Sequence, residues 1–229
     1  MDFREYINKI TYKTIFPNDP PHWLEVNNIN IPERAVDEKI VDLCVMPKMS
    51  TFAIAALINK AVNDMPEGQC YVNVGVWHGF TFLAGMIGNP KEKCIGIDNF
   101  SEFGGPRLEF RERYLKARSE NHHFFEMDYR KYFQHMHKLE DKIGFYLYDG
   151  AHDYENQLEG LKIAEPFLAD DALIIVDDTN WPDPYQATMD FMEASLNEWE
   201  IILDVKTASN GHPTWWNGIL VIKKGGLKL

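Results

Sequence analysis

Cysteine is scarce in this chain, and the few cysteines present argue against two kinds of site. The three residues Cys44, Cys70 and Cys94 are an odd number without a C-x-x-C pair. This spacing predicts neither a disulfide framework nor a zinc knuckle. We therefore expect three buried thiols in a reducing compartment.

Long hydrophobic runs are also missing. The stretch MDFREYINKITYK carries charges throughout, and no apolar run approaches the roughly 20 residues that a membrane-spanning helix needs. The sequence thus predicts no membrane partner and a cytoplasmic location.

Basic residues are outnumbered by acidic ones. There are 23 lysines and arginines against 35 aspartates and glutamates, which gives a formal net charge of -12. Such a charge repels phosphate backbones and anionic membranes, so nucleic acid is not expected as a partner. Most of the acidic excess is expected to be an ordinary solvated surface.

The chain does contain enough hydrophobic sequence for one core. Its 229 residues are 45% hydrophobic and 13% aromatic, which predicts one sizeable domain. Residues 1–45 hold the turn-forming stretches FPNDPPHW and NNINIP and show no sustained period. We predict that residues 1–45 form a wrapping segment or lid and a candidate dimer element, and that residues 46–229 form the main domain.

From residue 50 onward, short apolar runs alternate with amphipathic stretches, which is typical of βα units on a parallel sheet. The expected strands are CYVNVGV, KCIGIDNF, HHFFEMD, IGFYLYDG, DALIIVDDT, WEIILDVKT and GILVIKK. Helices are expected over residues 50–63, 81–87, 106–118, 130–138, 153–168 and 184–197. The last two runs are close enough to form an antiparallel pair. The pattern predicts an α/β fold with a mostly parallel, seven-stranded sheet and an antiparallel C-terminal strand.

Ligands of an open parallel sheet bind outside the carboxyl ends of its strands, so the residues that end each run are candidate site residues. The first turn, VNVGVWHGFTF, places Gly75 and Gly79 four residues apart, where the backbone can approach a ligand closely. It lacks the G-x-G-x-x-G pattern of a dinucleotide binder. A ligand without phosphates suits this turn better.

Asp98 ends the second strand, 19 residues after Gly79. In nucleotide-binding sheets, a carboxylate about 20 residues after the glycine turn binds a pair of ribose hydroxyls, because it can accept two hydrogen bonds. The alternative is that Asp98 caps a following helix.

The strongest group of candidates is acidic. Asp149, Asp177 and Asp178 end two strands that we expect to be neighbours, and three carboxylates without basic partners repel one another. A hard divalent cation such as Mg²⁺, which prefers oxygen ligands, would relieve that repulsion. His152, three residues after Asp149, suits a general base. Alternatively it is a metal ligand, or it caps the next helix.

Two aromatic features also lie near this edge. His78 lies inside the glycine turn, beside any ligand bound there. Apart from His78 and His152, the histidines are expected to be mostly surface residues without ligand spacing. A loop over residues 212–216 joins the last two strands. We expect it either to wall an apolar pocket or to pack its tryptophans on the helix layer.

Five motifs together resemble the class I S-adenosylmethionine-dependent methyltransferases over about residues 50–224. YVNVGVWHGFTF is similar to the first family motif, KCIGIDNF to the second and FFEMD to the third. The pair DGAHDYE and LIIVDDT is similar to the small-molecule O-methyltransferase branch that includes catechol O-methyltransferase and macrocin O-methyltransferase. The resemblance implies a Rossmann-like three-layer sandwich, S-adenosylmethionine as cofactor and a small-molecule hydroxyl as acceptor.

The same resemblance implies a set of cofactor residues. Gly75 and Gly79 would line the methionine part, Asp98 would bind the ribose, and Asp128 with Tyr129 would lie by the adenine. The complete predicted cofactor set is Asn73, Gly75, Trp77, His78, Gly79, Asp98, Asn99, Asp128, Tyr129 and Asp149. Asn73 departs from the family, which usually has a glutamate there to support the cofactor's amino end.

The metal and catalytic residues are implied in the same way. Asp149, Asp177 and Asp178 match the branch's metal ligands, and His152 falls where catechol O-methyltransferase has a basic lysine. The predicted catalytic residues are His152 and Asp149. The implied reaction is an in-line displacement at the sulfonium methyl, with the metal lowering the pKa of the acceptor hydroxyl.

Two other functions stay open on the sequence. One is a metal-dependent hydroxylase or hydrolase on the same fold, and the other is a non-catalytic cofactor-binding relative, for which Asn73 is the only hint. We expect the acceptor to be chosen by the N-terminal segment, the region 99–113 and the loop around Trp215, and none of these carries a code that the sequence alone makes readable.

Overall fold

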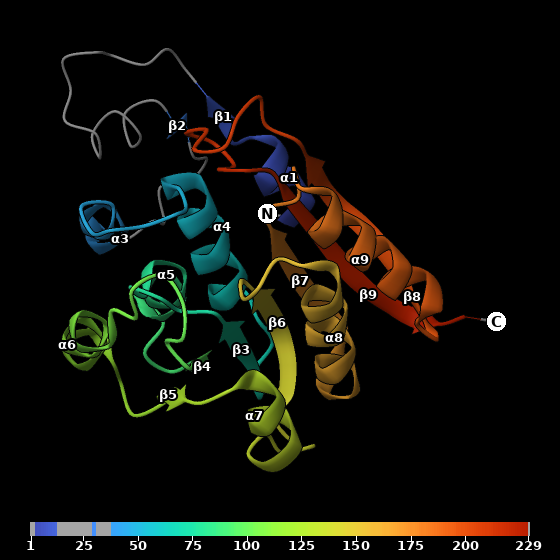
Figure 1. The fold of residues 1–229 in the computed structure, drawn as a ribbon, viewed down its shortest axis with the longest axis horizontal. Helices are drawn as coiled ribbons and strands as arrows, with labels where there is room; N and C mark the ends of the chain where they lie inside the picture. Colours follow the sequence, from blue (N-terminus) through green and yellow to red (C-terminus); the bar gives the residue numbers. More distant parts are fainter. Residues whose placement is uncertain (1–2, 13–28, 31–37, 229) are drawn as a thin grey trace.

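The computed structural model describes residues 3–12, 29–30 and 38–228. Its main sheet is built from β3 (Gln69–Val74), β4 (Lys93–Asp98), β5 (His122–Glu126), β6 (Lys142–Tyr148), β7 (Leu168–Asp177), β8 (Asn197–Val205) and β9 (Ile219–Leu227). The strand order is β5-β4-β3-β6-β7-β9-β8 (Figure 1). The pairs from β5 to β7 are parallel, and β9 is antiparallel to both β7 and β8. The predicted sheet and its antiparallel strand are confirmed.

Helices cover both faces of this sheet and make three layers (Figure 1). One face carries α4 (Phe52–Asn63), α5 (Phe80–Met86) and α6 (Arg107–Ala117). The other carries α7 (Tyr129–His135), α8 (Tyr154–Ala164) with the short 3-10 helix η1 (Glu165–Phe167), and α9 (Pro182–Ala194). Strand residues alternate between two cores, so Tyr71 packs in the first and Val72 in the second. The Rossmann-like three-layer sandwich is therefore confirmed.

The helix starts follow local capping chemistry. The Thr51 side chain accepts a hydrogen bond from the Ile54 N–H, which confirms the predicted serine or threonine cap of α4. Asp128 caps α7 and Asp153 caps α8 in the same way. Because Asp153 holds the cap position, the interpretation of His152 as a helix cap is wrong.

Part of the predicted N-terminal lid is described. It holds α1 (Phe3–Asn8), β1 (Thr11–Tyr12), β2 (Ile29–Asn30) and α3 (Glu38–Leu43). The sequence predicted no regular element here, because helices of six residues are too short to show a helical period. Tyr6, Ile7 and Ile40 are buried in the same core as α4 and α5. The rest of the segment lies outside the described residues, so the lid and the dimer element stay predictions.

None of the described helices combines the length and the apolar character needed to cross a membrane.

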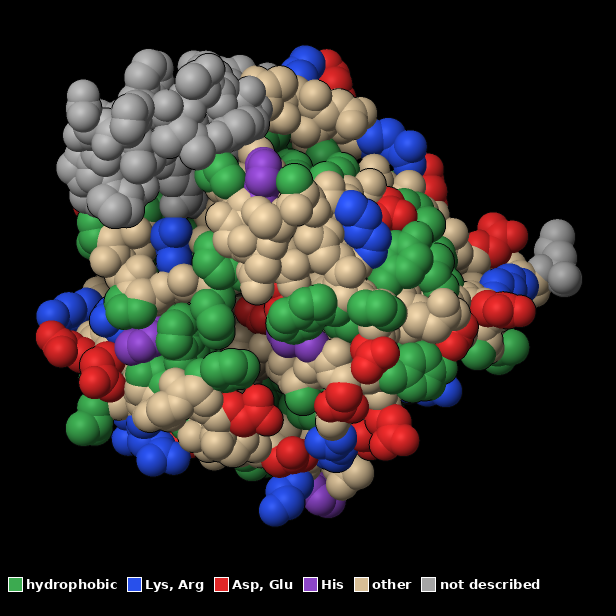
Figure 2. All heavy atoms as spheres, turned by 45° about the horizontal axis from the view of Figure 1, so that its top comes forward, with side chains coloured by type: hydrophobic (Ala, Val, Ile, Leu, Met, Phe, Trp, Pro, Cys, Tyr) green, Lys and Arg blue, Asp and Glu red, His purple; other side chains and the backbone are tan. Residues whose placement is uncertain are grey.

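The carboxyl ends of the parallel strands meet at the edge that forms the top of the sheet in Figure 1. Strand β3 lies between β4 and β6, so the strand order reverses there, and ligands bind at such a switch point. Figure 2 turns this edge toward the reader. It shows a hollow with acidic and histidine atoms at its base and hydrophobic side chains around it.

Candidate active site

A cavity of about 680 Å³ opens at the carboxyl edge of the sheet. Its volume lies within the roughly 300–1,000 Å³ of small-molecule sites. The strand-end residues that line it are Gly75, Asp98, Asp128, Asp149, Asp177 and Asp178. The sheet topology thus brings together residues that are far apart in the sequence.

The glycine turn is packed against the end of β6. Gly75 has a φ of 80°, and a Cβ atom there would lie 1.7 Å from the carbonyl oxygen of Asp149. One backbone hydrogen bond joins β3 to the end of β6, because the Asp149 N–H donates to the Val74 carbonyl at 2.8 Å. The Gly75 N–H donates to the Ile97 carbonyl of β4 at 2.9 Å, on the other side of the turn. Only glycine fits at position 75, because the chain's own backbone occupies the space.

Gly79 has a different role. It precedes α5 with a φ of 101°, and a Cβ atom there would lie 2.8 Å from the Phe110 ring. It is not among the residues that line the cavity. Of the predicted glycine pair, the cavity wall therefore contains Gly75 alone.

Asp98 holds the glycine turn through its carboxylate. One oxygen, Oδ2, accepts the N–H groups of Val76 and Trp77, each at 2.7 Å, and Oδ1 accepts the Phe100 N–H at 2.6 Å. It does not cap α6, which begins at Arg107 after Pro106. A carboxylate has about four acceptor positions, so roughly one remains for a ligand. Asp98 therefore supports the turn and also faces the cavity.

Asn73 lies behind the turn and is fully buried. Its Oδ1 accepts hydrogen bonds from the hydroxyls of Tyr71 at 3.3 Å and Thr81 at 3.0 Å, and its Nδ2 donates to the Gly75 carbonyl at 3.0 Å. It is not part of the cavity wall, whereas Thr81 is. Asn73 positions the turn from behind, and its predicted contact with the cofactor's amino end has no direct path.

The two aromatic residues of the turn diverge. Trp77 lines the cavity, and its indole N–H donates to the Phe103 carbonyl at 3.0 Å. His78 lies outside that wall, with its Nδ1 3.2 Å from the Arg113 guanidinium. Burial and the Arg113 charge lower the pKa of His78. Its predicted place beside the cofactor stays a prediction, whereas the predicted Asn99 does line the cavity.

At the end of the cavity formed by the starts of α7 and α8, the wall is polar and aromatic. Asp128 caps α7 by accepting the Arg130 N–H at 2.9 Å. The Arg130 guanidinium stacks 4.5 Å from the Tyr129 ring centre, and the Tyr129 hydroxyl donates to the Asn156 carbonyl at 3.5 Å. All four residues line the cavity. This end offers a flat aromatic surface with hydrogen-bonding groups around it.

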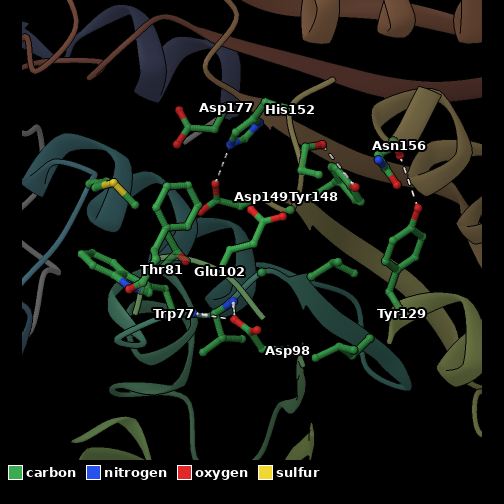
Figure 3. A pocket seen from close by; sticks show the side chains of 18 of the residues that line it. Trp77, Thr81, Asp98, Glu102, Tyr129, Tyr148, Asp149, His152, Asn156 and Asp177 are labelled. Carbon is green, nitrogen blue, oxygen red and sulfur yellow. Dashed lines mark hydrogen bonds and ion pairs between the residues drawn. The ribbon is translucent and has the colours of Figure 1, made fainter. Parts of the chain in front are cut away.

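His152 lies among the predicted acidic residues (Figure 3). Its Nε2 is 3.6 Å from Asp149 Oδ1 and 3.4 Å from Asp178 Oδ2. Burial alone would lower the pKa of His152, but the hydrogen bond and charge of Asp149, with the charges of Asp178 and Glu102, raise it. A positively charged imidazole in this place neutralises part of the acidic cluster.

The pKa values of the three carboxyl groups are raised as well, which favours their uncharged forms. Burial raises the pKa of Asp149, although His152 works against the rise. Burial and the charges of Asp149 and Asp178 raise the pKa of Asp177 well above its usual range. The pKa of Asp178 is raised too, chiefly by burial. The three carboxylates therefore repel one another, as the sequence predicted.

The predicted metal centre is not preformed. In the part of the chain that the structure describes, no three histidine, cysteine or acidic side chains lie in a metal-ligating arrangement. The imidazole of His152 contacts Asp149 and Asp178 instead and supplies positive charge there. The donor chemistry still suits a hard cation, because three carboxylates line the cavity and Asp178 Oδ1 is buried without a hydrogen-bond partner among the described residues.

Several wall residues were not singled out by the sequence, although two of them lie in the region 99–113 that was expected to choose the acceptor. They come from loops, and they include Met49, Glu102, Phe103 and Trp181. For Trp181 a signal existed, because the WP pair follows the acidic strand end after two residues and Pro182 begins α9. The other three have no period or spacing that could place them.

The aromatic loop between β8 and β9 serves both roles that the sequence left open. Trp215 is buried in the core beside α4 and α5. Trp216 lines the cavity, with a φ of 51°. One tryptophan therefore packs on the helix layer and its neighbour walls the pocket.

Comparison with known proteins agrees with this geometry. Residues 72–179 match a family model described as a methyltransferase domain. No curated protein matches the sequence. Among solved structures, the chain is similar to the O-methyltransferase TomG from Streptomyces achromogenes, which is involved in tomaymycin synthesis and was solved in complex with S-adenosylmethionine. The two are 12% identical with a TM-score of 0.59, over 83% of this chain and 91% of TomG.

Two further structures share the fold. A protein from Corynebacterium glutamicum is 11% identical with a TM-score of 0.61, over 85% of this chain and 93% of that one. A proposed O-methyltransferase from Klebsiella pneumoniae is 13% identical with a TM-score of 0.52, over 84% of this chain and 97% of that one. The family match over residues 72–179, with the strand order and the glycine turn on the same sheet edge, identifies a methyltransferase domain in this part of the chain.

Proposed function

We propose that this enzyme transfers the methyl group of S-adenosylmethionine to a hydroxyl oxygen of a small molecule. The observation that carries the proposal is the placement of His152, whose Nε2 lies within 3.6 Å of Asp149 and 3.4 Å of Asp178 on the wall of the cavity that Asp98 also lines. Figure 3 displays Asp98 and His152 on different sides of that cavity. The similarity to TomG, an O-methyltransferase, supports oxygen as the acceptor atom.

The chain's own residues would prepare both reactants. Asp98 would accept a ribose hydroxyl, and Tyr129 with Asn156 would hold the adenine end. Asp149 orients the His152 ring, so Nε2 faces the point where the carboxylates converge. An acceptor hydroxyl at that point would give its proton to the neutral imidazole as the oxygen attacks the methyl carbon. Alignment of oxygen, carbon and sulfur supplies most of the rate gain.

We further propose a divalent cation at Asp149, Asp177 and Asp178, because their oxygen donors suit Mg²⁺ and one oxygen of Asp178 lacks a partner among the described residues. When bound, the cation would lower the pKa of the acceptor hydroxyl. The positive charge of His152 would then no longer be needed to offset the carboxylates. Its pKa would fall, and the imidazole would become neutral and able to accept a proton.

Calorimetric titration tests the cofactor. S-adenosylmethionine and S-adenosylhomocysteine are each titrated with and without Mg²⁺, into wild type and Asp98→Ala. We expect micromolar binding to wild type and none to the variant. Absence of binding to wild type under every condition would exclude the proposed function and favour a different metal-dependent activity.

The metal and the acceptor atom are tested separately. In thermal denaturation, the Tm of wild type should rise with increasing Mg²⁺, while the Tm of Asp177→Asn should change little. Radiolabelled S-adenosylmethionine is then offered to matched phenol, aniline and thiophenol compounds. Label recovered as an ether supports oxygen transfer, whereas label on nitrogen or sulfur alone contradicts it.

A further inference from the structure

The part of the cavity around His152 has a charge pattern of its own. Glu102 lies on the loop between β4 and α6 and lines the cavity. Figure 3 shows its side chain pointing into the space near Asp149. Its negative charge reaches His152 and helps to raise the pKa of that ring. Glu102 therefore extends the acidic field of Asp149 and Asp178 toward the mouth of the cavity.

Among the described residues, no lysine or arginine forms an ion pair with Glu102. Among the described residues that line the cavity, the only lysine and arginine are Lys48 and Arg130. Arg130 is paired with Asp128 and Glu159 at the far end. The Lys48 ammonium donates to the Ser50 carbonyl at 3.2 Å and lies over the Phe80 ring. The Glu102 carboxylate has no ion pair with any described residue, so its charge is available to a ligand.

The rim of the cavity is apolar. Met49, Phe103 and Trp181 line it and are 41%, 64% and 43% exposed. They come from three separate segments, before α4, before α6 and before α9. Exposed large hydrophobic groups gathered at a pocket mouth mark a binding surface for an apolar body. In Figure 2, hydrophobic side chains border the hollow that has acidic atoms at its base.

We infer that the acceptor is an amphipathic molecule that carries a positively charged amine bound by Glu102, while its apolar body contacts Met49, Phe103 and Trp181. This inference rests on the proposed function, since it takes His152 as the place of the reacting hydroxyl. An anionic acceptor is disfavoured because Glu102, Asp149 and Asp178 would all repel it.

Three matched phenols test the charge preference. They are 2-(4-hydroxyphenyl)ethylamine, 4-ethylphenol and 4-hydroxyphenylacetate, which share the ring and differ in charge. Each is titrated calorimetrically into the complex of the full chain with S-adenosylhomocysteine at low salt. We expect the amine to bind tightest and the carboxylate weakest. Raising the salt concentration should narrow the difference, because exposed charges are screened.

Variants separate the charge from the apolar rim. Glu102→Gln should reduce the preference for amine over carboxylate by about fivefold, the upper range for an exposed ion pair. Glu140→Gln is the matched control, because it removes the same charge just before β6, at the opposite edge of the sheet. Its charge preference should equal that of wild type. Trp181→Ala should weaken all three phenols by a similar factor, because it removes apolar contact without changing charge.

The possible outcomes are distinct. If wild type fails to bind S-adenosylhomocysteine, the proposed function fails before the acceptor is tested. The inference is overturned if wild type binds S-adenosylhomocysteine but binds 4-hydroxyphenylacetate more tightly than the amine. It is also overturned if wild type binds none of the three phenols. Equal effects of Glu102→Gln and Glu140→Gln would also overturn it. So would a Glu102→Gln variant that loses affinity for S-adenosylmethionine but not for S-adenosylhomocysteine, because Glu102 would then face the sulfonium.

Discussion

Replacing Asp98 with asparagine keeps the size of the side chain but removes one of its two acceptor oxygens. In the structure Oδ2 accepts the N–H groups of Val76 and Trp77, and Oδ1 accepts the N–H of Phe100. Asparagine can keep two of these bonds through its single carbonyl oxygen, while its NH₂ group can accept none. At least one bond to a charged group is therefore lost, and an N–H group is left facing another donor.

The magnitude follows from these bonds. A hydrogen bond to a charged group contributes roughly 1.5–3 kcal/mol to stability. Asp98 is only partly buried, so we expect Asp98→Asn to lower the free energy of unfolding by about 2 kcal/mol. If the same carboxylate also binds the ribose, roughly 2–3 kcal/mol of binding free energy is lost as well, which makes the Kd for S-adenosylhomocysteine about 100-fold weaker.

Urea denaturation and calorimetric titration measure the two effects on the same protein sample. Glu126→Gln is the matched control, because it removes a strand-end carboxylate of β5 that does not line the cavity. It should leave the Kd within about twofold of wild type. A variant Asp98→Asn as stable as wild type would refute the role of Asp98 in holding the turn. A loss of stability with an unchanged Kd would refute its role in binding the cofactor.

Three further changes probe the glycine turn and the acidic cluster. Gly75→Ala should lower the free energy of unfolding by more than about 3 kcal/mol, because the new Cβ would clash with the Asp149 carbonyl at a φ of 80°; a urea midpoint equal to that of wild type would contradict this. His152→Asn should lower kcat by about 10²- to 10⁴-fold while the Kd for S-adenosylhomocysteine stays within about twofold; a parallel loss of both would indicate a structural role. Without divalent cation, the free energy of unfolding should fall as pH rises above about 6.5, the unfolded-state pKa of histidine. The reason is that the pKa of His152 is higher in the folded state, so its charge stabilises the fold at low pH. This stabilisation is lost as the pH rises through the folded-state pKa. Burial raises the pKa of Asp178, which adds a fall of the same sign that begins near the unfolded pKa of about 3.9, so Asp178→Asn should flatten the pH dependence of the urea midpoint.

The sheet and most strand-end residues could be predicted because both depend on local pattern. Alternating apolar runs identify strands, and the carboxyl ends of parallel strands must meet at one edge. That rule placed Gly75, Asp98, Asp128, Asp149 and Asp177 together, and all of them line one cavity. No knowledge of loop conformation was needed for these residues.

The residues that the sequence could not position depend on side-chain direction and on loops. Asn73 belongs to the expected strand, but its side chain turns toward Thr81 behind the turn. His78 turns to Arg113, a residue of α6 that no local pattern pairs with it. Glu102 and Phe103 lie on a loop with positive φ at Phe103, and no period determines where such a loop folds.

The contact between Gly75 and Asp149 also has a consequence for how the acceptor preference of such an enzyme can evolve. The two backbones are joined so closely that any shift of the turn must carry the end of β6 with it. We therefore expect His152, three residues further on, to keep its spacing from the glycine turn when different acceptors bind. The loops that carry Met49, Glu102 and Trp181 are not part of this joint. New acceptor preferences can thus arise by substitution in those loops while the reacting groups stay in register.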